Sequence, residues 1–198
     1  AYYIIYVALQ TPAGILIDQF GARKLLSSGA LVCCLGCFLF ANAVTAHVAI
    51  LGRFLMGGGM AFAFIGSMYL AGRWFPARYL SLMIGIAETL AMTGAVIGNL
   101  LLANLVDNFG WRACFHIAVY VAGCLTLISW LFIRDQPENV YFKPNRMTIA
   151  KVKTNLRILM RKPKIWLNGL FLGIMYTTIT VFASLWGIPF LKAKYGMS

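Results

Sequence analysis

The sequence predicts an all-α integral membrane protein, and three observations support this. Of its 198 residues, 61% are hydrophobic and only 11% are charged, whereas a soluble domain carries roughly a quarter charged residues. Apolar runs of the length that a spanning helix requires, about 20 residues, recur along the chain. Strand-type alternation is absent from these runs, so a β-barrel is not expected.

Six apolar segments are each long enough to cross a membrane. Proline, glycine or polar residues stand at the joints between them, as expected where helices end. The segments cover residues 1–18, 25–45, 47–73, 80–106, 111–133 and 165–187. Because the first segment opens at Ala1 without the pattern of a signal peptide, we expect this partial chain to start inside a longer protein.

Lysine and arginine gather on one side of the predicted bundle. This group comprises Arg23, Lys24, Arg73, Arg78, Arg134, Lys143, Arg146, Lys151, Lys153, Arg157, Arg161, Lys162 and Lys164. The other side holds Arg112, Lys192 and Lys194, and this asymmetry assigns the larger group to the cytoplasm. The net charge of +12 therefore reflects orientation in a lipid bilayer, and no nucleic-acid partner is expected.

Residues 134–164 form a long polar stretch between apolar segments. Within it, residues 147–160 combine apolar and basic side chains as in an amphipathic helix on the inner membrane face. We expect residues 1–133 to form most of an N-terminal bundle with five helices, 134–164 to be a cytoplasmic basic linker, and 165–198 to begin a C-terminal bundle. An alternative for the linker is a regulatory lipid-binding element.

The turn between the first two segments carries the most specific pattern. It reads Gly14-x3-Asp18-x2-Gly21-x-Arg23-Lys24. This spacing resembles the loop between the second and third helices of major facilitator superfamily transporters. Gln19 departs from the family pattern, which usually has a basic residue there. The resemblance implies a transporter rather than an enzyme, with a helical bundle that alternates its access between the two sides of the membrane.

Two further segments resemble the same family. The motifs are Arg53-Phe54-Leu55-Met56-Gly57-Gly58-Gly59 and Gly85-x8-Gly94-x3-Gly98. The first is similar to a signature of the fourth helix and the second to the start of the antiporter motif in the fifth. Asn99 stands where that motif has a proline, which weakens a drug-antiporter interpretation. The six segments then correspond to helices two to seven of a twelve-helix fold, and the partner of this chain is the missing remainder of the same transporter.

The resemblance also implies a cytoplasmic gate around the polar turn. Its residues are Gly14, Asp18, Gly21, Arg23, Lys24 and Arg73. A helix N-terminus favours a nearby carboxylate, so Asp18 is expected to meet bases and a helix end of the other half. Arg73 is its expected partner in this half. The alternative is an exposed turn residue of little energetic consequence.

Arg53 lies inside an apolar segment with no acid three or four residues away. An unpaired guanidinium that faces lipid costs at least ~2.5 kcal/mol, so we expect Arg53 to face the bundle cavity. There it would bind a carboxylate or phosphate of a substrate, or tune a proton-carrying acid. The alternative is that its long side chain extends to the nearby membrane interface.

Glu88 is the one acid inside a predicted spanning segment. A carboxyl group buried in a membrane favours its protonated form, so Glu88 is a candidate proton carrier. The alternative is a structural hydrogen bond from Glu88 to a neighbouring helix, near Thr89 or Thr93. Weaker candidates for the substrate and proton pathway are Tyr6, Gln10, Asn168 and Tyr176. Close helix packing is expected at the small residues Gly57, Gly59, Gly85, Gly94 and Gly98.

These observations favour a secondary active transporter with alternating access. We expect proton-coupled symport of a small polar or anionic metabolite in a bacterial cytoplasmic (inner) membrane. No metal spacing, phosphate loop or nucleophile arrangement occurs, so neither a cofactor nor an enzymatic activity is expected. The alternatives are a drug or metabolite antiporter and a non-transporting membrane subunit of a redox complex.

Overall fold

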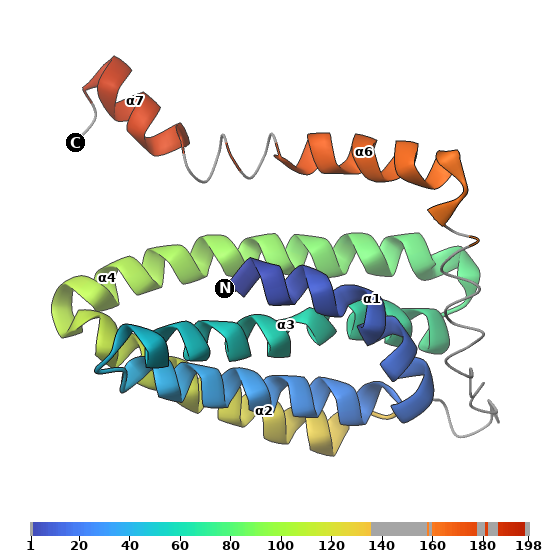
Figure 1. Cartoon of the computed structure of the whole chain (residues 1–198), viewed down its shortest axis with the longest axis horizontal. Helices are drawn as coiled ribbons and strands as arrows, with labels where there is room; N and C mark the ends of the chain where they lie inside the picture. The colour runs from blue at the N-terminus through green and yellow to red at the C-terminus, as the bar shows by residue number, and fades with distance from the viewer. Residues whose placement is uncertain (1, 136–157, 159, 178–180, 182–185, 197–198) are drawn as a thin grey trace. The chain divides into compact units, whose positions relative to one another are not determined.

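The structure is a computed structural model that describes residues 2–135, 158, 160–177, 181 and 186–196. The described part is helical throughout and contains no strand. Its helices are α1 (Tyr2–Phe20), α2 (Ala22–Ala41), α3 (Ala46–Trp74), α4 (Ala77–Phe132), α6 (Pro163–Thr177) and α7 (Gly187–Tyr195) (Figure 1). The prediction of an all-α chain is therefore confirmed for these residues.

The chain divides into two compact units, Ala1–Arg146 and Met147–Ser198. The first contains α1 to α4, and the second contains α6 and α7. The boundary between the units lies inside the predicted linker, residues 134–164. Most of the amphipathic helix predicted for residues 147–160 lies outside the described residues.

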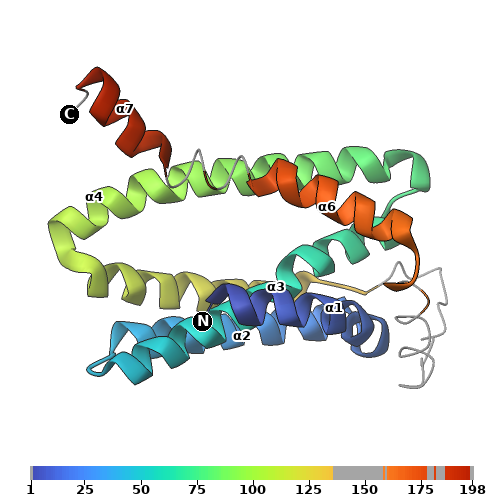
Figure 2. The same ribbon diagram turned by 45° about the horizontal axis from the view of Figure 1, so that its top comes forward.

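In the first unit, α2 packs against α3 and α4, while α1 packs against α3. Helix α4 has 56 residues and contains one non-helical residue, Gly110, with φ 78° and ψ 160°. The chain reverses there, so α4 consists of two antiparallel segments, 77–109 and 111–132 (Figure 2). The sequence predicted a joint between residues 106 and 111, and the structure places it at a glycine because that backbone conformation suits few other residues.

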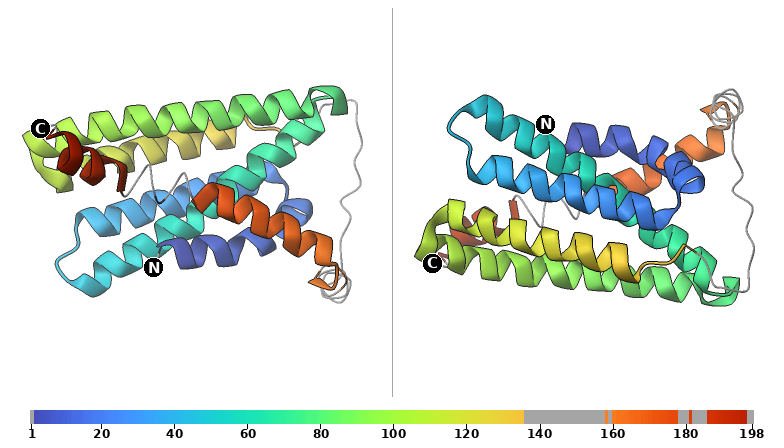
Figure 3. Two further views of the ribbon diagram at one scale, coloured as in Figure 1. Left: turned by 90° about the horizontal axis from the view of Figure 1, so that it is seen from above. Right: turned by 90° about the horizontal axis from the view of Figure 1, so that it is seen from below.

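Glycines bring α2 and α3 into close contact. A methyl group added at Gly29 would lie 2.8 Å from the carbonyl oxygen of Gly59, and one at Gly36 would lie 2.8 Å from that of Gly52. Gly29 and Gly36 are seven residues apart on α2, and Gly52 and Gly59 are seven residues apart on α3. Each helix therefore carries its two glycines on one face. Absence of side chains therefore allows the two backbones to approach, and the two helices run side by side in both views of Figure 3.

Basic residues cluster at one end of this unit, which we call the basic end. It carries Arg23, Lys24, Arg73, Arg78 and Arg134, at the start of α2, the end of α3, the start of α4 and just after α4. A small core of Ile17, Ala22 and Leu25 holds α1, α2 and α3 together there. The opposite end contains the turn at Gly110 and Arg112.

Three described helices, α2, α3 and α4, are long and apolar enough to cross a membrane. Helix α1 does not meet the same criteria, and α6 has 15 residues, fewer than the ~20 that span a bilayer. The predicted sixth segment, 165–187, includes residues 178–180 and 182–185, which lie outside the described residues. The six crossings therefore remain a prediction.

Candidate functional site

The predicted gate residues lie together at the basic end. Asp18 stands exposed in the last turn of α1, and the guanidinium of Arg73 stacks on the ring of Tyr69 at 4.5 Å. Tyr69 also lies within electrostatic range of both Asp18 and Asp135. The fold thus brings Asp18, Arg73 and a second acid around one tyrosine, while a direct pairing of Asp18 with Arg73 stays a prediction.

The α1–α2 turn consists of Gly21 alone. It has φ 85° and ψ 157° and makes no side-chain capping bond to α2. The first N–H groups of a helix have no partner within the helix. Here the backbone N–H of Arg23 donates to Oδ1 of Asp135 at 2.8 Å, across 112 residues of sequence. A carboxylate at a helix N-terminus is stabilising both as a cap and through the helix dipole.

Space around Gly21 matters as much as its backbone angles. A methyl group added there would lie 2.6 Å from Oδ2 of Asp135, well inside van der Waals contact. Only a glycine therefore combines the positive φ with room for the capping carboxylate. Gly14, one turn before Asp18, has no such neighbour, because no described residue lies within 4 Å of a methyl group added to it.

Arg23 ties the same turn to the end of α4. Its Nε donates to the carbonyl oxygen of Trp130 at 2.7 Å, and its guanidinium lies 4.9 Å from the centre of the Trp130 ring. We call the group Gly21, Arg23, Trp130 and Asp135 the Asp135 clasp. A second link joins α3 to the same chain end, since Nε1 of Trp74 donates to the carbonyl oxygen of Arg134 at 3.0 Å.

Asp135 is not among the site residues predicted from the sequence. It comes three residues after the end of α4 at Phe132, so it is an acid close to an apolar run, the same signal that selected Asp18. The sequence does not indicate which residue Asp135 binds, because the start of α2 is remote in the chain. Lys24, the other basic residue of the turn, is exposed.

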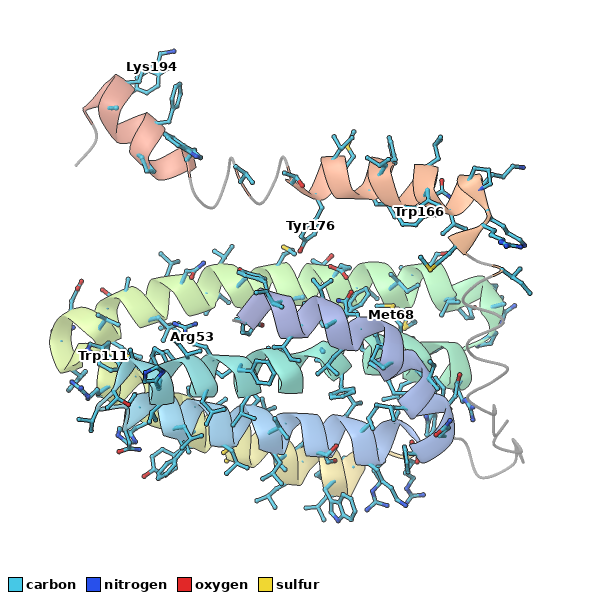
Figure 4. The ribbon with its side chains drawn as sticks, in the orientation of Figure 1. Arg53, Met68, Trp111, Trp166, Tyr176 and Lys194 are labelled. Carbon is cyan, nitrogen blue, oxygen red and sulfur yellow. The ribbon has the colours of Figure 1, made fainter. Side chains whose placement is uncertain are left out.

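Arg53 lies at the opposite end, in an aromatic environment. Its guanidinium is 4.6 Å from the ring centre of Phe40 and 5.6 Å from that of Phe115. The two rings lie 4.5 Å apart, and Trp111 completes the group at 5.8 Å from Phe40. We call Arg53, Phe40, Trp111 and Phe115 the Arg53 cluster; Arg53 and Trp111 are labelled in Figure 4. It joins α2, α3 and the second segment of α4.

The polar surroundings of Arg53 differ from those of Arg23. Among the described residues, no hydrogen bond or ion pair to the Arg53 side chain occurs, and the side chain is exposed within this unit. Tyr2, at the start of α1, lies within electrostatic range of it. The arrangement places the guanidinium against two aromatic rings and leaves its N–H groups for another partner.

Glu88 lies half-buried on the first segment of α4. Its side chain forms no hydrogen bond or ion pair with the described residues, including Arg53. The neighbouring hydroxyls are occupied locally, because Thr89 donates to the carbonyl oxygen of Gly85 and Thr93 donates to that of Thr89, each at 2.8 Å. The predicted alternative, a structural hydrogen bond from Glu88 to a neighbouring helix near these threonines, does not occur among the described residues.

The weaker pathway candidates are spread over both units. Tyr6 and Gln10 are half-buried on α1, where Tyr6 stacks on Tyr2 at 6.1 Å. Asn168 and Tyr176 are exposed on α6, in the second unit. The two pairs belong to different units, and their common role in one pathway stays a prediction.

The glycines predicted to pack helices form two sets. Gly57 faces α1, where an added methyl group would lie 2.9 Å from a side-chain methyl of Ile5, and Gly59 faces α2. Around Gly85, Gly94 and Gly98 nothing lies within 4 Å of an added methyl group. These three therefore make no helix contact among the described residues.

Comparison with known proteins identifies the family. The family model of the Major Facilitator Superfamily matches residues 1–198. The chain belongs to the Major Facilitator Superfamily. It is accordingly an integral membrane protein of a transporter family and not an enzyme. The sequence motifs at Asp18 and Arg53 had suggested this family, and that prediction is confirmed.

Several curated transporters are similar to this superfamily member. An uncharacterized transporter of Bacillus subtilis (strain 168), YybO, is 29% identical over 99% of the chain and 48% of the relative. A quinolone resistance transporter of Acinetobacter baumannii is 30% identical over 70% of the chain and 33% of the relative. A probable sulfoacetate transporter of Cupriavidus necator, SauU, is 26% identical over 75% and 34%. The chain thus spans about half the length of these relatives or less.

Proposed function

We propose that this chain forms part of a secondary active transporter that moves a small anionic metabolite together with protons. The observation that carries the proposal is the Arg53 cluster. Family membership supports transport, and one relative is named a probable sulfoacetate transporter. The excess of basic residues at one end and the bacterial relatives support a bacterial cytoplasmic membrane with the basic end inside.

The chemistry of Arg53 favours an anionic ligand. A guanidinium presents five N–H donors in a planar fork that fits a carboxylate, phosphate or similar group bidentately. Contact with Phe40 and Phe115, whose ring centres lie 4.6 and 5.6 Å from the guanidinium, restricts where that fork can lie. A carboxylate or sulfonate is therefore the natural counter-ion, because the described residues supply none.

Glu88 is the proposed proton carrier. It is an acid in a helix that is long and apolar enough to cross a membrane, and it is half-buried without a hydrogen bond to the described residues. An acid inside a membrane-spanning helix commonly belongs to an ion or proton pathway. In this proposal Asp18 and Arg73 belong to the cytoplasmic gate, which closes when the substrate site opens to the outside.

A second candidate function is drug or metabolite antiport. The relative named a quinolone resistance transporter favours it. Asn99, in place of the proline of the antiporter motif, argues against it. The family assignment gives no support to a non-transporting subunit of a redox complex.

Uptake into liposomes by the complete transporter tests the proposal. With a proton gradient and small carboxylates or sulfoacetate as substrates, we expect Arg53→Ala to lower apparent affinity by about tenfold or more, in line with loss of a charge-assisted hydrogen bond. Arg53→Lys should retain part of the binding, since it keeps the charge but loses the fork. Thermal shift should report the same loss, because a ligand stabilises the state that it binds.

Arg112→Ala is the matched control. Arg112 lies at the same end and stacks on Trp111 at 4.4 Å, but it is outside the Arg53 cluster as defined. Normal uptake by both Arg53 variants would eliminate the binding role. Stabilisation and export of quinolones in place of carboxylate uptake would establish the second candidate.

A further inference from the structure

Asp135 accepts a hydrogen bond from the start of α2, directly after the turn that follows Asp18. This position suggests a role beyond helix capping. We propose that Asp135 is a positioning residue of the cytoplasmic gate, acting through Asp18. The inference rests on the proposed gate function of Asp18. It concerns a residue that does not itself meet the other half of the gate.

The first step is the shortness of the turn. Gly21 is the one residue between α1 and α2, and its N–H donates to the carbonyl oxygen of Ile17 at 2.9 Å. With no flexible loop, the orientation of α2 sets that of the last turn of α1. A contact that fixes the start of α2 therefore also fixes the orientation of Asp18 in the last turn of α1.

The second step is competition for the positive end of α2. Gly21 makes no side-chain cap, and the first turn of α2 contains no acid. The unpaired N–H groups and the helix dipole attract a carboxylate. Asp18, three residues before Gly21, is a local carboxylate able to turn toward this site. Because Asp135 occupies it at 2.8 Å, Asp18 stays exposed and available to another partner.

The third step is the anchoring of the cap itself. Asp135 comes two residues after Ile133, the residue that ends α4. Near the same end of α4, Nε of Arg23 donates to the carbonyl oxygen of Trp130 at 2.7 Å. Nε1 of Trp74 donates to the carbonyl oxygen of Arg134 at 3.0 Å. The start of α2 and the ends of α3 and α4 are thus connected, so a displacement of one is transmitted to the Asp18 turn.

The test compares four variants of the complete transporter in liposomes: Asp135→Asn, Asp135→Glu, Asp18→Asn and the Asp18/Asp135 double variant. Initial uptake of radiolabelled substrate is divided by the amount of folded transporter. We expect Asp135→Asn, which keeps the capping oxygen but removes the charge that faces the helix dipole, to lower maximal rate about two- to fivefold, with KM unchanged. Asp135→Glu should restore most of the rate. The double variant should be no slower than Asp18→Asn, because both substitutions act through one side chain.

Asp107→Asn is the matched control, since Asp107 is an exposed aspartate of α4 near the opposite end. A purely structural cap would reduce the amount of folded protein but not the rate per folded molecule, and that result would overturn the inference. Multiplying effects in the double variant would also overturn it. Normal transport by Asp18→Asn would instead refute the gate function on which the inference rests.

Discussion

Two arginines of this chain stack on aromatic rings at opposite ends of one bundle, yet their polar surroundings differ. Arg23 lies 4.9 Å from the Trp130 ring, and its Nε also donates to the Trp130 carbonyl at 2.7 Å. Arg53 lies 4.6 Å from the Phe40 ring and makes no side-chain hydrogen bond to the described residues. The first guanidinium joins two helices, whereas the second keeps its hydrogen-bonding capacity.

This difference separates a structural arginine from a candidate binding residue. A hydrogen bond within the protein contributes to stability and is lost when a ligand competes for the donor. Stacking alone orients a guanidinium without occupying its N–H groups. Charge and aromatic contact alone would not have distinguished the two residues, because both are arginines beside aromatic rings.

The largest expected effect on stability comes from substitution of Gly21, two residues before Arg23. Gly21→Ala places a side chain at φ 85° and ψ 157° and a methyl group 2.6 Å from Asp135. Backbone strain of about 1–3 kcal/mol and a lost cap of about 1 kcal/mol should both appear. The apparent melting temperature of the purified protein should fall clearly. Gly14→Ala, in open space on the same helix end, is the control and should be neutral or stabilising; equal melting of the two variants would contradict the clasp.

Removal of each guanidinium tests the comparison directly. Arg23→Ala should reduce stability by about 1–2 kcal/mol, through loss of the bond to Trp130 and of stacking. Arg53→Ala should cost less in the absence of ligand, about 0.5–1 kcal/mol from stacking alone. Chemical or thermal unfolding in detergent measures both. If Arg53→Ala is the more destabilising variant, then Arg53 has a structural role and the contrast between the two ends disappears.

The smallest effect should come from the rings beside Arg53. Phe115→Leu preserves apolar volume but removes one of the two stacking faces, at 5.6 Å. Loss of a cation–π interaction of about 0.5–1 kcal/mol, which orients the guanidinium, should weaken substrate binding roughly two- to fivefold. The amount of folded protein should change little. Isothermal titration or thermal shift with the transported anion measures it. Phe109→Leu, an exposed aromatic of α4, is the control, and an equal loss of affinity there would show that ring stacking is not the cause.

Helix positions could be predicted well from the sequence, because hydropathy is a local property. The second and third segments, 25–45 and 47–73, correspond to α2 (Ala22–Ala41) and α3 (Ala46–Trp74). The reversal within α4 was anticipated between residues 106 and 111 and lies at Gly110. The sixth segment, 165–187, corresponds to a described helix only as far as Thr177.

Pairings between helices could not be predicted in the same way. Gly59 and Gly85 look alike in sequence, as glycines in apolar helices, but Gly59 faces α2 while nothing lies within 4 Å of a methyl group at Gly85. Arg53 had two possible surroundings, and its stacking on rings of α2 and α4 is a property of three helices together. The capping role of Asp135 could not be predicted, because its partner, the backbone N–H of Arg23, is 112 residues away.

The sequence by itself determined that this is a helical membrane protein of the Major Facilitator Superfamily, where its helices lie and which end is basic. These properties depend on composition, hydropathy and short motifs, which each segment carries independently. Only the tertiary structure decided which acid caps α2, which glycines meet a neighbouring helix and which arginine keeps its donors unoccupied. Capping, close packing and stacking act over a few ångströms between distant segments, so they exist only once those segments are brought together.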